Sequence, residues 1–305
     1  MTASAPRIER SFDPIALAQV LSRLARRPEP AWLHAEVARR MSQRLEIIRM
    51  QPERLIEWWP GLGGSGSILA EAYPRAERQW VEPTQAWQER TRGLQPAWWR
   101  RTPWSRSAPD VLLEENLSDT PEVPLIWANM MLHAAVDPLA VLTRWHQLLS
   151  VDGFVMFSCL GPDSLRELRA LYAREGWPSP HVDFVDMHDL GDMLVQAGFA
   201  DPVMDQEQLT LTWPDAPALL AELRQIGGNL SAERFSGLRT PRWYRQLCEG
   251  LSETASTNDR IPLTFEIVYG HAFKAPPRVP VRSETTVSLQ DMKGMVRRAR
   301  TTGGR

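Results

Sequence analysis

The stretch RLIEWWPGLGGSGSILAEAY (54–73), followed by RQWVEP (78–83), decides the fold of this chain. RLIEWW and RQWVEP are short apolar runs typical of strands, and ILAEAY between them is typical of a helix. The glycines of PGLGGSGS predict a turn, because glycine adopts backbone conformations that other residues avoid. A strand, a turn, a helix and a second strand in direct succession predict a β-α-β unit of a parallel sheet.

The same alternation continues along the chain in both directions. Further strands are predicted at 109–115, 124–132, 153–160, 202–213 and 263–275, and helices at 14–26, 31–50, 137–150, 163–176, 187–199 and 216–228. The run GFVMFSCL is nearly all apolar, as a central parallel strand should be. We therefore expect an α/β fold with a doubly wound, mostly parallel sheet and an antiparallel strand pair at one edge.

The domain organisation follows from changes in composition. Residues 1–30 are rich in Arg and Pro and predict a partly helical lead, whereas 31–275 carry the alternating pattern of one domain. Residues 276–305 are polar and Arg-rich without hydrophobic periodicity, which predicts a mostly disordered tail.

Composition excludes several classes of function. The chain has 35 Lys+Arg and 37 Asp+Glu, a net charge of −2, so it lacks the basic balance of a broad nucleic-acid platform. Two cysteines cannot build a disulfide framework or a CxxC zinc site, which favours a reducing, cytoplasmic setting. No secretory signal or membrane-length apolar run is present. His181 and His188 lie near aspartates, but their spacing is too loose to predict a metal site.

Acidic residues and glycines meet where a doubly wound sheet binds its ligands, at the carboxyl ends of the strands. The first strand ends near Glu57 and is followed by Gly61 and Gly63, and the second strand ends at Glu82. An acidic residue at the end of the second strand commonly accepts hydrogen bonds from ribose hydroxyls. The pattern fails G-x-G-x-x-G and contains no GK[ST], so it predicts a nucleoside-containing ligand with hydroxyls and positive charge rather than a phosphate-rich one.

The order RLIEWWPGLGG, WVEPT, IWANMMLH, GFVMFSCLGPDSLRELR resembles class I S-adenosylmethionine (SAM)-dependent methyltransferases, which have a Rossmann-like fold. The stretches GPDSLRELRALY, FVDMHDLGDMLVQAGFADPVMDQEQLTLTW and LTFEIVYGHAF resemble one branch in particular, the malonyl-[acyl-carrier protein] O-methyltransferases. The resemblance covers about residues 31–275. It implies methyl transfer from SAM to the free carboxylate of a malonyl thioester on acyl carrier protein, an early step of biotin (pimelate) synthesis.

The resemblance also implies cofactor-binding residues. Glu57 matches the acidic residue near the methionine amino group, and Glu82 matches the one on the ribose hydroxyls. Gly61 and Gly63 match the later glycines of the family loop, whose first glycine is replaced by Trp59. Asn129 matches an Asn on the methionine or methyl side.

Other implied sites concern the substrate. The family builds a helical lid at about 215–250, where Arg239, Arg242 and Arg245 are candidates for the malonyl carboxylate or the phosphate of the carrier arm. His133, after the fourth strand, is the one catalytic candidate. A carboxylate nucleophile needs no strong general base, so positioning and exclusion of water should dominate catalysis.

Two alternatives remain open from the sequence. One keeps SAM and changes the methyl acceptor, and the other is a non-catalytic protein related to complex I assembly factors, which resemble this branch. Trp59 is the main observation behind the second alternative, because Trp adopts a glycine conformation only at a cost. Trp is unusually abundant, with 13 residues against eight Phe and four Tyr, and Trp58, Trp59, Trp80 and Trp127 are predicted near the cofactor loop.

Overall fold

The computed structural model describes residues 11–27, 29–93, 109–117, 120–255 and 258–277. The chain divides into residues 1–275 and 276–305, and nearly all described residues belong to the first unit. The predicted disordered tail lies outside the described residues from 278 onward, as do the first ten residues of the lead and the stretch 94–108. Among the described residues, no helix is long and apolar enough to cross a membrane.

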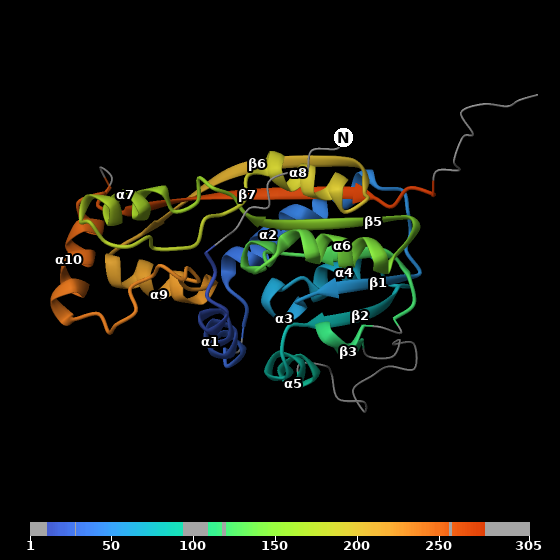
Figure 1. The fold of residues 1–305 in the computed structure, drawn as a ribbon, viewed down its shortest axis with the longest axis horizontal. Helices are drawn as coiled ribbons and strands as arrows, with labels where there is room; N and C mark the ends of the chain where they lie inside the picture. Colours follow the sequence, from blue (N-terminus) through green and yellow to red (C-terminus); the bar gives the residue numbers. More distant parts are fainter. Residues whose placement is uncertain (1–10, 28, 94–108, 118–119, 256–257, 278–305) are drawn as a thin grey trace, which may run out of the picture. The chain divides into compact units, whose positions relative to one another are not determined.

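One seven-stranded sheet forms the centre of the first unit (Figure 1), in the order β3-β2-β1-β4-β5-β7-β6. The strands are β1 (Arg54–Trp58), β2 (Glu77–Glu82), β3 (Asp110–Leu113), β4 (Val123–Ala128), β5 (Leu149–Leu160), β6 (Ala200–Trp213) and β7 (Ile261–Phe273). Strands β1 to β5 pair in parallel, and β7 runs antiparallel to both β5 and β6. This arrangement confirms the predicted doubly wound sheet with its antiparallel edge.

The helices agree with the sequence pattern at most positions. They are α1 (Pro14–Ala25), α2 (Trp32–Gln43), η1 (Arg44–Ile47), α3 (Pro60–Gly63), α4 (Gly66–Ala72), α5 (Gln85–Gly93), η3 (Glu114–Asn116), η4 (Leu132–Ala134), α6 (Pro138–Leu148), α7 (Arg166–Arg174), α8 (Met187–Gln196), α9 (Ala216–Ile226) and α10 (Pro241–Ser252). Helices η3 and η4 stand where strand ends were predicted, the predicted helix 31–50 ends at Ile47, and three α-helices were not predicted. The predicted glycine turn contains the short helix α3. Two further helices, α5 and α10, lack an individual prediction, although α10 lies at the end of the region 215–250.

Both faces of the sheet are covered, as a parallel sheet requires. One hydrophobic cluster joins Ile56 and Trp58 of β1 to buried residues of α1, α5, α6 and α8. The other joins Leu55 of the same strand to α2, α4, α7, α9 and α10. Because neighbouring strand residues point to opposite faces, Leu55 and Ile56 enter different clusters.

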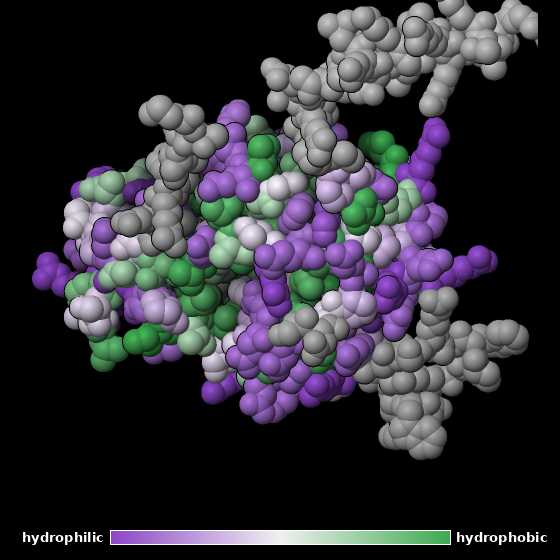
Figure 2. Space-filling model, turned by 45° about the vertical axis from the view of Figure 1, so that its right-hand side comes forward, coloured by the Kyte–Doolittle hydropathy of each residue, from purple (hydrophilic) through white to green (hydrophobic). Residues whose placement is uncertain are grey.

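The long strands β6 and β7 extend beyond the parallel strands and carry α7, α9 and α10 at that end (Figure 1). In Figure 2, hydrophobic residues gather towards the same end of the view. Phe235, Leu238 and Tyr244, between α9 and the first turn of α10, are large exposed apolar residues. This end of the molecule therefore combines a set of helices with exposed apolar surface.

Trp59 connects β1 to α3 in a backbone conformation that glycine favours. Its φ of 53° and ψ of 50° are left-handed, and it serves as the N-cap of the helix that Pro60 begins. The indole is buried, and its Nε1 donates to Glu114 Oε2 over 3.2 Å. The chain thus keeps the turn that a glycine would make and uses the side chain for packing.

Substitutions at Trp59 should reverse the usual order of alanine and glycine. Both Trp59→Ala and Trp59→Gly lose the buried indole, but only alanine keeps a Cβ in the left-handed conformation, at about 1–2 kcal/mol. We expect Trp59→Gly to have the higher free energy of unfolding, by about 1 kcal/mol, in urea denaturation.

Trp145 provides the matched control, because it is equally buried but lies inside α6. There alanine should be more stable than glycine by about 1 kcal/mol. The same order at both positions would show that Trp59 carries no left-handed strain.

Candidate cofactor and substrate site

Glu57 lies at the carboxyl edge of the sheet between two tryptophans. In the strand register its neighbours are Trp80 of β2 and Trp127 of β4. Trp80 Nε1 donates to Glu57 Oε1 over 2.8 Å, and Arg78 Nη1 lies 3.7 Å from the same oxygen. The carboxyl group is 1% exposed, and its Oε2 has no hydrogen-bond partner among the described residues.

Glu82 ends the adjacent strand and is bound by the chain itself. The backbone N–H of Gly61 donates to Glu82 Oε1 over 2.9 Å, and the Thr91 hydroxyl donates to the same oxygen over 2.6 Å. Glu82 is fully buried, and within the described part of the chain its Oε2 also lacks a hydrogen-bond partner. Both carboxyl groups therefore present one satisfied and one unsatisfied oxygen.

Burial changes the protonation of this pair. It raises the pKa of both carboxyl groups from 4.5 to about 7, although hydrogen bonds from Trp80 to Glu57 and from Thr91 to Glu82 oppose the shift. The mutual repulsion of the two groups adds to the shift at Glu82. Near neutral pH each carboxyl group is therefore poised between its neutral and its charged form.

The two glycines of the loop have a packing reason in this structure. A Cβ on Gly61 would lie 2.7 Å from Trp87 and 2.9 Å from Glu82 Oε1. A Cβ on Gly63 would lie 3.0 Å from the Asn129 carbonyl oxygen. Only glycine lets α3 approach α5 and the end of β4 this closely.

Asn129 holds three segments together at the end of β4. Its Nδ2 donates to the carbonyl oxygens of His34 and Gly63, over 2.8 and 2.6 Å. Its Oδ1 accepts from the Ser158 hydroxyl over 2.7 Å. The side chain of Asn129 could therefore contact a ligand only by giving up one of these three hydrogen bonds.

The donors that SAM offers match the two unsatisfied carboxyl oxygens. Ribose hydroxyls can donate to Glu82 Oε2, and a cationic amino group can pair with Glu57 Oε2. Buried unpaired acceptors are costly in a folded protein, so a ligand that satisfies them gains free energy. The residues fit the cofactor chemically, and their burial means that the surrounding loop must open to admit it.

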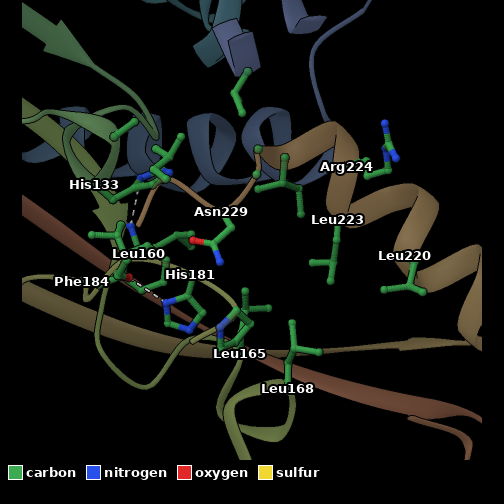
Figure 3. A pocket seen from close by; sticks show the side chains of 18 of the residues that line it. His133, Leu160, Leu165, Leu168, His181, Phe184, Leu220, Leu223, Arg224 and Asn229 are labelled. Carbon is green, nitrogen blue, oxygen red and sulfur yellow. Dashed lines mark hydrogen bonds between the residues drawn. The ribbon is translucent and has the colours of Figure 1, made fainter. Parts of the chain in front are cut away.

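An apolar cavity of about 360 Å³ lies beside this loop. Its walls come mainly from α1, α7, α9 and α10, and Figure 3 shows Leu220 and Leu223 of α9 facing Leu165 and Leu168 across it. Leu62 of α3 also lines it. The cavity therefore touches the same short helix that contacts Glu82.

The structure brings His133, the catalytic candidate from the sequence, to the cavity. His133 lies in η4 after β4, and its Nδ1 accepts from the Leu160 N–H over 3.4 Å. Arg239, Arg242 and Arg245 do not line the cavity; Arg239 stacks on Phe235 and Trp243 instead. These arginines stay a prediction for binding the substrate.

The sequence did not predict several residues that lie at the site. Arg224 of α9 is the basic residue at the cavity, and His181 contributes an imidazole to its wall. Thr91 and Trp87 reach the loop from α5, a helix without apolar periodicity strong enough to predict it. The helical periodicity of α9 could have placed Arg224 near its apolar face, but no local sequence pattern predicts that His181, Thr91 and Trp87 lie at the site.

Curated relatives share most of the length of the chain. No family model matches it. A malonyl-[acyl-carrier protein] O-methyltransferase of Gallionella capsiferriformans is 38% identical over 277 residues, which cover 88% of this chain and 93% of that protein. The protein of the same name from Laribacter hongkongensis is 34% identical and covers 89% and 90%.

Solved structures support the fold. A methyltransferase-like protein from Bacillus halodurans superposes with a TM-score of 0.53 at 11% identity and covers 77% of this chain and 99% of its own. The YcgJ protein of Bacillus subtilis gives a TM-score of 0.50 at 13% identity, with 78% and 98% covered. The chain shares the fold of these structures. Because it is 38% and 34% identical to the two curated relatives over most of their length, it belongs to the malonyl-[acyl-carrier protein] O-methyltransferase family.

Proposed function

We propose that the chain transfers the methyl group of SAM to the free carboxylate of a malonyl thioester carried by acyl carrier protein. The observation that supports this most is the pair of buried carboxyl groups of Glu57 and Glu82, each with an unsatisfied oxygen. They lie on neighbouring strands beside an apolar cavity, in a chain of the corresponding family.

In this proposal Glu82 binds the ribose hydroxyls and Glu57 binds the methionine amino group. Gly61 and Gly63 let the loop pack closely, and Trp59 sets its direction. The bound cofactor supplies an electrophilic methyl group on a positively charged sulfur. Trp80 and Trp127 keep water from Glu57 and so strengthen its attraction for a cation.

The acceptor carboxylate is already an anion and needs no general base. The bound cofactor would supply the methyl carbon and a thioether leaving group that keeps the electron pair of the broken bond, and the part of the protein would be to hold an acceptor oxygen in line with that carbon. The products are a methyl ester and the neutral thioether. The apolar walls of the cavity exclude water from this step, which favours a reaction that neutralises two charges.

A non-catalytic role is the second candidate, and one observation favours it. Gly61 and Thr91 already donate to one oxygen of Glu82, and Arg78 lies near one oxygen of Glu57, so the chain itself already satisfies half of each carboxyl group. A protein that only retains the fold would keep these contacts permanently closed.

Incubation with methyl-labelled SAM and malonyl-loaded acyl carrier protein tests the proposal. We expect label in a base-labile ester on the carrier, and rescue of a biotin auxotroph that lacks the methyltransferase. Calorimetry without any heat of binding for SAM or its demethylated product favours the non-catalytic role. Binding without transfer to the malonyl carrier points to another methyl acceptor.

Glu82→Gln should weaken cofactor binding. Glutamine still accepts from Gly61 and Thr91, but its amide nitrogen replaces the free acceptor oxygen. We expect the Kd for SAM to rise about 5- to 100-fold in calorimetry, as for loss of a hydrogen bond to a charged group. Glu77→Gln, at the exposed start of the same strand, is the control. Equal affinities for all three proteins would remove Glu82 from the site.

The raised pKa of Glu82 also predicts how stability depends on pH. The folded state holds its proton up to about pH 7, whereas the unfolded chain releases it near 4.5. The free energy of unfolding should therefore fall between these values as pH rises. Between pH 5 and pH 8, the free energy of unfolding should fall by about 1–3 kcal/mol less in Glu82→Gln than in the wild type. Urea denaturation without ligand measures this difference. If the free energies of unfolding of the two proteins change equally with pH, the pKa of Glu82 is not raised in the folded state.

A further inference from the structure

One imidazole in the cavity wall is unlike the other polar groups there. His181 is 6% exposed and lies against the cavity between Phe184 and Leu165 (Figure 3). Its ring stacks on Phe184 at 4.6 Å with an angle of 6° between the planes. The orientation of the ring is therefore fixed by packing.

The hydrogen bonding of His181 decides which nitrogen carries the proton. Nδ1 lies 2.7 Å from the carbonyl oxygen of Val182. A carbonyl oxygen only accepts, so Nδ1 must carry the hydrogen and donate it. Burial lowers the pKa of this imidazole, which keeps the ring neutral at pH 7. Nε2 is then a lone-pair acceptor with no hydrogen to give.

That acceptor has no partner in the described protein. Nε2 of His181 is buried and makes no hydrogen bond. The carboxamide of Asn229, which Figure 3 shows near His181, donates from Nδ2 to the Ser179 carbonyl and accepts at Oδ1 from the Ser231 N–H, and makes no hydrogen bond to Nε2 of His181. His181 lines the cavity, but its Nε2 is itself buried, so a ligand that carries a hydrogen-bond donor can reach this fixed, neutral acceptor only if the cavity wall opens there.

We infer that His181 is a substrate-binding residue whose Nε2 accepts a hydrogen bond from an amide N–H of the pantetheine arm that bears the malonyl thioester. The inference rests on the proposed function. At neutral pH the malonyl group carries only acceptors, so it cannot satisfy Nε2. The arm is a flexible chain with two amide groups and a hydroxyl group, and its methylene and methyl segments suit walls of leucine. We assign the donor to an amide, which the substrate analogues below test.

Substrate analogues test the inference without altering the protein. Malonyl-pantetheine is compared with two isosteric analogues, in each of which one amide is replaced by an ester that lacks the N–H. In the wild type, we expect one analogue to lose about 5- to 50-fold in kcat/KM, mainly through KM, and the other to stay near the parent. Values within twofold for all three substrates overturn the inference.

His181→Phe removes the acceptor and retains a flat ring on Phe184. We expect the variant to use the parent and the sensitive ester analogue equally well, both at the low wild-type value for that analogue. His188→Phe is the control, because His188 is strongly exposed on α8 and lies outside the cavity lining. A His181→Phe protein with the wild-type preference for the amide overturns the inference.

A binding measurement separates this inference from the proposed function. If the wild type methylates no malonyl thioester, the proposed function fails. The isotope-labelled imidazole of His181 is then followed by NMR during titration with malonyl-pantetheine. A shift of the Nε2 resonance that the sensitive ester analogue does not produce supports the contact, and an unchanged resonance at saturation overturns it.

Discussion

Two carboxyl groups buried at the carboxyl edge of the sheet constrain everything around them. Glu57 and Glu82 each need donors, and in low dielectric an unsatisfied carboxyl oxygen is expensive. The left-handed Trp59 starts α3 at Pro60, and this short helix delivers the N–H of Gly61 to Glu82. The strained turn is thus tied to the burial of an acid one strand away.

The abundance of tryptophan has a structural explanation at this edge. Trp80 and Trp127 flank Glu57 in the register, and Trp87 packs against Gly61. Large flat side chains remove water from the carboxyl groups, which raises their pKa and strengthens any later pairing with a cation. Trp59 favoured a non-catalytic alternative from the sequence, whereas Trp80 and Trp127 create the electrostatic conditions for binding a cationic ligand.

The sequence predicted the sheet because most strands contain an apolar run, β6 alternates in polarity, and the helices between most of them have clear periodicity. It also located Glu57, Glu82 and His133, since strand ends can be identified from local pattern. It could not predict α3, because a helical turn through PGLG depends on the bond from Gly61 to Glu82. His181 was equally hidden: its role depends on the cavity formed by α1, α9 and α10, which lie far apart in the sequence.

The short helix α3 joins the two halves of the proposed reaction. Gly61 donates to Glu82, Gly63 accepts from Asn129, and Leu62 between them lines the cavity while its carbonyl oxygen lies 2.9 Å from His34 Nδ1. A ligand that reaches the free oxygen of Glu82 therefore lies next to Gly61, one residue from the cavity wall formed by Leu62. In-line transfer requires the donor and acceptor pockets to meet at one point, and α3 is the described element that borders both. Binding at one pocket is thus mechanically linked to the shape of the other.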